Sequence, residues 1–91
     1  MHKCTDKEAI ANRLKKIEGQ VRGIQKMVEE GKPCDDVLIQ IGAVKSALHK
    51  TGQVVLEEHM YHCVVKGIKN GEEEETIEHL VNSLNQFSKI V

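Results

Sequence analysis

The sequence predicts an all-α protein whose protomer has three helices. Aromatic residues make up only 2% of the 91 residues, so Ile, Val, Leu and Ala supply most of the apolar side chains. One proline and 30% charged residues suit packed helices better than a sheet. Apolar residues also recur at alternating steps of four and three, the period of an amphipathic helix. We expect a single domain, residues 1–91, near the lower size limit for one buried core.

The first helix is predicted from Asp6 to Glu30. Gly31 and Pro33 end it, because glycine closes helices readily and proline resets the chain before the next element. Its narrow apolar seam comprises Ile10, Leu14, Ile17, Val21, Ile24 and Val28.

The second helix is predicted to start near Asp35 and Asp36, whose charges oppose the positive end of the helix dipole. It should continue for some 36 residues to about Asn70, a length of about 54 Å. Gly52 is a candidate position for a bend. A helix this long needs partners along its length that one chain cannot supply, so the sequence predicts self-association. Its seam comprises Val37, Ile41, Val44, Leu48, Thr51, Val55, His59 and Cys63.

The third helix is predicted from Glu72 to Ile90. The acidic run from Glu72 to Glu75 suits a solvated helix start. Its apolar stripe comprises Ile77, Leu80, Val81, Leu84 and Phe87.

Charge is distributed unevenly along the chain. Residues 1–50 hold ten Lys and Arg against seven Asp and Glu, and residues 51–91 hold three against seven, which gives +3 and −4. The first half can therefore present a basic face. No apolar run approaches the roughly 20 residues that cross a bilayer, and the polar start does not resemble a signal peptide. We expect a cytoplasmic protein without a membrane partner, in which cysteines serve as ligands or sensors more often than as structural disulfides.

Cys34, His59 and Cys63 form the most informative motif. His59 and Cys63 are four residues apart, so they share one helix face. Cys34 lies twenty-five residues before His59 on the same predicted helix, a distance of roughly 37 Å. No metal ion bridges that distance, so the three residues can meet only between two antiparallel chains.

Two thiolates and an imidazole are soft donors that favour Cu(I), Zn(II) or related ions. Three ligands favour Cu(I), because structural zinc sites usually take four. His2 or Cys4 could add a fourth ligand, and Ni(II) or Co(II) would then be alternatives. From spacing alone, small core cysteines and an ordinary surface or core histidine are equally good interpretations.

Arg13, Lys16 and Gln20 share one face of the first helix, and Lys50 adds charge to the second. Such residues can neutralise DNA phosphates, although a solvated helix face is the simpler interpretation for one chain. Repetition of the face in an oligomer favours DNA binding, because several weak contacts then act together.

Three stretches give the chain a resemblance to the CsoR/RcnR family of bacterial metal-sensing repressors. They are Asn12–Ile24 (NRLKKIEGQVRGI), Cys34–Ile41 (CDDVLIQI) and Glu58–Val64 (EHMYHCV). The resemblance covers essentially the whole chain. It implies an antiparallel dimer with a four-helix core, a dimer-of-dimers tetramer, and repression by the metal-free tetramer with release of operator DNA on metal binding.

Within this resemblance, the Cu(I) ligands of copper sensors match Cys34 of one protomer with His59 and Cys63 of its neighbour. The DNA-contacting residues match Arg13 and Lys50, with Lys16 and Gln20 beside the first. His2 falls where nickel- and cobalt-responsive members carry an N-terminal histidine ligand.

Two positions depart from the copper-sensing pattern. Copper sensors often have a tyrosine before the first cysteine and a glutamate in the third helix, where they orient the ligands. Pro33 and His79 occupy those positions here. Groups around a metal site tune its affinity, so this departure bears on the metal and on how its binding is transmitted.

Other functions remain as alternatives. A persulfide sensor would use Cys34 and Cys63 alone, and His59 argues against it. A thiol enzyme would need an oxyanion hole and an orienting acid, neither of which the sequence offers at a recognisable spacing. A purely structural helical module would bind neither metal nor DNA. We expect no enzymatic activity and no small-molecule substrate.

Overall fold

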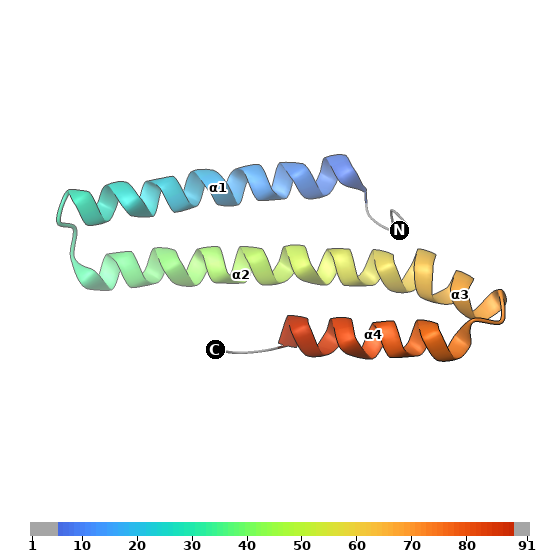
Figure 1. Ribbon diagram of the computed structural model, residues 1–91. Coiled ribbons are helices and arrows are strands. Elements are labelled where there is room, and N and C mark those ends of the chain that lie inside the picture. Colours follow the sequence, from blue (N-terminus) through green and yellow to red (C-terminus); the bar gives the residue numbers. More distant parts are fainter. Residues whose placement is uncertain (1–5, 89–91) are drawn as a thin grey trace. The chain divides into compact units, whose positions relative to one another are not determined.

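The computed structural model describes residues 6–88, and this part of the chain consists of helices and the turns between them (Figure 1). The helices are α1 (Lys7–Glu29), α2 (Cys34–His59), α3 (Val65–Lys69) and α4 (Glu73–Ser88). A π-helical segment, η1 (Met60–Val64), joins α2 to α3. Residues 6–88 contain no strand, which confirms the predicted all-α class.

α1 begins at an N-capping aspartate and ends before a glycine. The Asp6 side chain accepts a hydrogen bond from the Ala9 backbone N–H at 3.1 Å, which satisfies one of the free donors of the first turn. At the other end Gly31 has a φ of 71°, a left-handed conformation that suits glycine. The Lys32 N–H then donates to the Met27 carbonyl at 3.0 Å and closes the helix.

The second predicted helix is confirmed as a helical run without a gap from Cys34 to Lys69. The bend considered at Gly52 is not found, because α2 continues through this residue as a regular α-helix. The helical geometry changes instead at Met60–Val64. There the Val65 N–H bonds to the Met60 carbonyl, five residues back, so η1 has wider turns than an α-helix. No local sequence signal marks this π-helical segment.

The α3–α4 connection is a close contact between two short helical pieces. Gly71 turns the chain with a φ of 78°, and the Glu72 N–H bonds to the Gly67 carbonyl at 2.9 Å. α4 then packs against α3 and η1. A Cβ added at Gly67 would collide with the Thr76 side chain, so this contact requires glycine.

Contacts divide the described residues into two compact units, 6–53 and 54–88. In the first unit, α1 and the beginning of α2 run side by side in opposite directions (Figure 1). Ile17 and Thr51 are buried there, and Val64 is buried in the second unit. The Thr51 hydroxyl donates to the Ala47 carbonyl at 2.9 Å, which makes this polar side chain compatible with an apolar seam.

The apolar seams are only partly covered within one chain. In α1, Leu14, Val21 and Val28 remain 45%, 42% and 61% exposed. In α2, Ile41 and Leu48 remain 46% and 47% exposed. No helix among residues 6–88 has the length and apolar character that crossing a bilayer requires.

We predict that Gly67→Ala destabilises the fold. The new methyl group must displace Thr76, and overpacking of this kind costs about 1–3 kcal/mol. Urea denaturation followed by circular dichroism measures the change in the free energy of unfolding.

Gly42→Ala is the matched control, because an added Cβ at this α2 position meets no atom within 4 Å. It should stabilise the protein by about 0.5–1 kcal/mol through helix propensity. Adding Thr76→Ala to Gly67→Ala should recover part of the loss. Equal stability of the Gly67→Ala and Gly42→Ala proteins would contradict the packing argument.

Candidate functional site

Cys34 opens α2 as an exposed free thiol. The residue before it, Pro33, begins the helix through its carbonyl, which accepts hydrogen bonds from the N–H groups of Asp36 at 3.1 Å and Val37 at 3.2 Å. Proline has no N–H of its own to leave unsatisfied at this helix start. Pro33 therefore fixes the backbone that presents the Cys34 thiol.

His59 and Cys63 lie at the junction of α2 with η1. His59 is the last residue of α2, Cys63 is the fourth residue of η1, and both side chains are half-buried. Val64, next to Cys63, is 7% exposed and anchors the π segment. The two donors are thus one helical turn apart on a stretch where the helical geometry changes, a feature that is frequent at functional sites.

The surroundings of the two cysteines differ. Cys34 is a free and exposed thiol, whereas the Cys63 side chain is half-buried. A metal-binding Cys63 must be a thiolate.

Cys34 and His59 are the first and last residues of one α-helix of 26 residues. Among residues 6–88, no three His, Cys, Asp or Glu side chains come close enough to hold a metal ion. His2, the predicted fourth ligand, and Cys4 lie outside the described residues. One protomer therefore contributes separate parts of the predicted site.

His79, the other position that departs from the copper-sensing pattern, is exposed on α4. α4 packs against η1, the segment that carries Cys63. The exposed ring of Tyr61, also in η1, lies 6.0 Å from that of His62, and the two rings are tilted by 56°.

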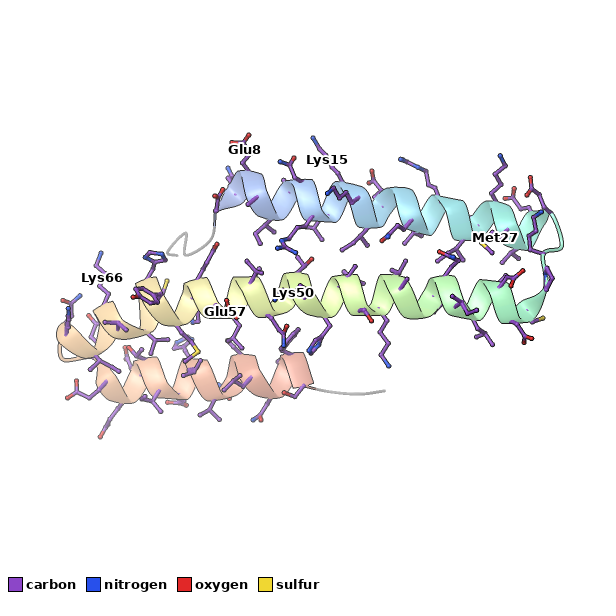
Figure 2. All side chains as sticks on the ribbon, turned by 180° about the vertical axis from the view of Figure 1, so that it is seen from behind. Glu8, Lys15, Met27, Lys50, Glu57 and Lys66 are labelled. Carbon is purple, nitrogen blue, oxygen red and sulfur yellow. The ribbon has the colours of Figure 1, made fainter. Side chains whose placement is uncertain are left out.

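The four predicted DNA-contacting residues belong to the unit of residues 6–53. Arg13, Lys16 and Gln20 are exposed on α1, and Lys50 is exposed on α2. Figure 2 labels Lys50 on the ribbon of α2. All four side chains are accessible to a ligand in solution.

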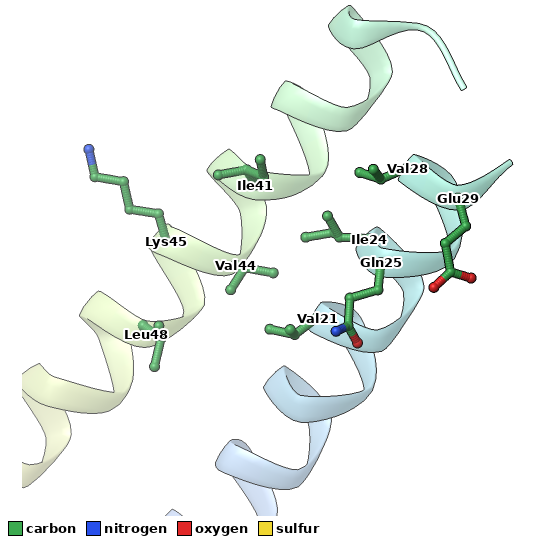
Figure 3. Close-up of a pocket in the computed structure, with 9 residues that line it drawn as sticks. All are labelled: Val21, Ile24, Gln25, Val28, Glu29, Ile41, Val44, Lys45 and Leu48. Atoms are coloured by element: carbon green, nitrogen blue, oxygen red, sulfur yellow. The ribbon is translucent and has the colours of Figure 1, made fainter. Parts of the chain in front are cut away.

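A groove of about 700 Å³ lies between α1 and α2 in the same unit. The α1 side of its lining includes Val21, Ile24 and Val28, and the α2 side includes Ile41, Val44 and Leu48 (Figure 3). All six belong to the seams predicted from the sequence. The seams thus meet across an open apolar groove instead of a closed core.

Comparison with protein families gives a match over residues 6–86 to the model described as metal-sensitive transcriptional repressor. The copper-sensing transcriptional repressor CsoR of Bacillus subtilis is 47% identical over 89 residues, which cover 97% of this chain and 88% of that protein. The copper-sensing repressor RicR of Mycobacterium tuberculosis is 51% identical over 65 residues, which cover 71% of this chain and 68% of that protein.

Two solved structures are similar over almost the whole chain. The copper-sensing repressor CsoR with Cu(I) from Geobacillus thermodenitrificans has a TM-score of 0.89 at 46% identity and covers 98% of this chain and 95% of its own. The nickel-responsive transcriptional regulator InrS has a TM-score of 0.84 at 36% identity and covers 96% and 98%.

Proposed function

The chain belongs to the family of metal-sensitive transcriptional repressors, and from this premise we propose that it is a copper-responsive repressor. The metal-free oligomer binds operator DNA, and Cu(I) binding between two chains releases it. The protein functions as one domain, residues 1–91, in the cytoplasm.

The observation that carries this proposal is the continuity of α2. Cys34 and His59 occupy its two ends, which at 1.5 Å per residue lie roughly 37 Å apart. A metal–sulfur or metal–nitrogen bond is only about 2.0–2.3 Å long. These donors can therefore share one ion only if Cys34 of one protomer approaches His59 and Cys63 of another.

The donor set supports Cu(I) as the inducer. Two thiolates and one imidazole are soft, and three donors suffice for Cu(I). The names of the two curated relatives describe copper sensing, and one similar structure contains Cu(I). Nickel is the second candidate, because InrS is similar over nearly the whole chain and His2 could supply a fourth ligand.

The exposed seams support the assembly that this site needs. Val28 is 61% exposed and Leu48 is 47% exposed although both line the apolar groove. A second hairpin of α1 and α2 packed on this groove would remove that apolar surface from water, which is favourable by about 25 cal/mol per Å². An antiparallel pair of this kind forms a four-helix core, and two such dimers form the proposed tetramer.

Arg13, Lys16, Gln20 and Lys50 are the proposed DNA-contacting residues. The arginine and the lysines neutralise phosphates, and Gln20 adds a hydrogen-bonding side chain beside them. Repetition of the face over four protomers turns individually weak contacts into one binding surface.

Release of DNA follows from a difference in affinity. Cu(I) must bind more tightly to the protein arrangement that binds DNA poorly, and by reciprocity DNA then weakens Cu(I) binding by the same factor. We propose that α4, which packs against η1 and carries His79, shifts when Cys63 binds the metal. Pro33 holds Cys34 in place for metal binding.

The choice of metal is tested by anaerobic titration of the fully reduced protein with Cu(I) in the presence of a strong chelator, and separately with Ni(II). We expect one tightly bound Cu(I) per protomer and weak Ni(II) binding, with His2→Ala leaving Cu(I) affinity unchanged. Tight Ni(II) binding that His2→Ala abolishes, together with weak Cu(I) binding, would assign a nickel sensor instead.

Cys34→Ala should separate sensing from folding. The thiol is exposed at a helix start, so its loss should change the free energy of unfolding by no more than about 0.5 kcal/mol. DNA binding should persist, while Cu(I) no longer releases the DNA because the site lacks one thiolate. A fluorescence anisotropy assay with labelled operator DNA measures DNA binding and its release by Cu(I). Release of the DNA from Cys34→Ala at the wild-type Cu(I) concentration would show that Cys34 is not a ligand.

Arg13→Ala should weaken operator binding and reduce its salt dependence. Each lost phosphate contact lowers the slope of log K against log salt by about 0.9. Lys66→Ala, which removes an exposed charge from α3, serves as the control and should leave the slope unchanged. If the Arg13→Ala slope matches that of the wild-type protein, Arg13 makes no phosphate contact.

A further inference from the structure

α1 carries a second basic surface that the proposed DNA contacts do not use. This surface, the basic stripe, consists of Lys15, Gly19, Arg22, Gly23 and Lys26. Steps of three and four residues place the stripe along one side of the helix. Lys15, Arg22 and Lys26 are all exposed.

The two glycines of the stripe have no role that the described residues explain. Glycine inside a helix is less favourable than alanine by about 0.5–1 kcal/mol. A Cβ added at Gly23 would meet nothing within 4 Å, and one at Gly19 would meet only the Arg22 guanidinium at 4.0 Å. Gly67 differs, because its own chain fills the space beside it. The bare backbone at Gly19 and Gly23 therefore suits a partner that approaches α1 from outside.

The charge around this bare backbone is strongly positive. Residues 12–26 contain five Lys and Arg and one acid, Glu18, which gives a local charge of +4. Glu18 lies 3.6 Å from Arg22, and both side chains stay more than two-thirds exposed, at 68% and 69%. Arg22 therefore remains accessible to a second anion.

The geometry of α1 arranges these charges on both sides of the glycines. At about 100° per residue, Gly19 and Gly23 lie opposite the apolar seam, with Lys15 and Lys26 to one side and Lys16 to the other. Figure 2 shows Lys15 on the side of α1 that faces away from α2.

We propose that the basic stripe is a second DNA contact, in which one phosphodiester strand lies along α1 over Gly19 and Gly23. Lys15, Arg22 and Lys26 neutralise its phosphates. From Lys15 to Lys26 the helix rises about 16 Å, close to the rise of four or five nucleotides in one strand of a duplex. This inference rests on the proposed function, since it extends the DNA interface of the same repressor.

Charge favours DNA over a second copy of the chain as the occupant. A two-fold contact brings the same surface of both subunits together, so it would place two basic stripes against each other. Such like-charge contacts are unfavourable, whereas a phosphate backbone offers complementary charge and releases counterions when it binds.

The charge part of the proposal is tested with Lys15→Gln/Lys26→Gln in the metal-free protein, by anisotropy of labelled operator DNA over a range of salt concentrations. Two lost phosphate contacts should lower the salt slope by about 1.8 for each engaged protomer. Lys66→Gln/Lys69→Gln removes the same charge from α3 and should leave the slope unchanged. Glu18→Gln, which frees Arg22 from its acidic neighbour, should tighten binding.

The close-approach part is tested with Gly23→Ala. The substitution should raise the melting temperature through helix propensity and yet weaken DNA binding by about tenfold or more, equivalent to about 1.4 kcal/mol. Gly42→Ala, with equally open surroundings on α2, should also raise the melting temperature but leave DNA affinity unchanged. Opposite effects on stability and affinity at Gly23 alone would not arise from a general disturbance of the fold.

Failure of this proposal is distinguishable from failure of the proposed function. If the wild-type protein binds operator DNA and releases it with Cu(I), but the Lys15→Gln/Lys26→Gln and Gly23→Ala proteins bind with wild-type affinity and slope, the stripe is not a DNA contact. A change of oligomeric state in these variants by sedimentation velocity would make it a chain–chain interface instead. No DNA binding by the wild-type protein would overturn both.

Discussion

The central constraint on this protein is the length of α2. A helix of 26 residues separates Cys34 from His59 by far more than a coordination bond spans, and Cys63 follows in η1. A site that uses all three donors therefore needs two chains, and in the proposed function metal binding depends on how those chains are arranged. Sensing and assembly are therefore coupled in the proposed mechanism.

The need for a second chain also accounts for the exposure of the apolar seams. Helices that pack only within their own chain would bury their apolar residues, but Leu14, Val28 and Ile41 stay 45%, 61% and 46% exposed. In the proposed assembly a partner chain covers these side chains and so removes more apolar surface from water, which is the main driving force for folding. In the proposed function, a metal that changes the packing between chains acts on the same interface that stabilises those chains. Metal binding can in this way change the affinity for DNA.

Much of the fold was predictable from the sequence, because helix periodicity and the terminators Gly31 and Pro33 are local signals. The long second helix was predicted for the same reason. The π segment was not predicted, since no local signal marks where a helix widens to accommodate an extra residue in one turn. The Gly67–Thr76 contact was not predicted either, because it depends on tertiary packing. The candidate ligand and DNA-contacting residues came from spacing and family resemblance, whereas the open space around Gly23 could be seen only in the coordinates. The roles of Cys34, His59 and Cys63 as ligands remain a proposal.

Complementation between two inactive proteins tests the inter-chain site most directly. Cys34→Ala and Cys63→Ala chains are unfolded together, refolded under reducing conditions and titrated with Cu(I) against a chelator. In a two-fold dimer, a mixed pair keeps one intact site, so random pairing should restore about a quarter of the wild-type high-affinity sites while each variant alone shows none. If mixed dimers form but the mixture binds no more Cu(I) than the separate variants, the three residues do not share a site between chains, and the account is wrong.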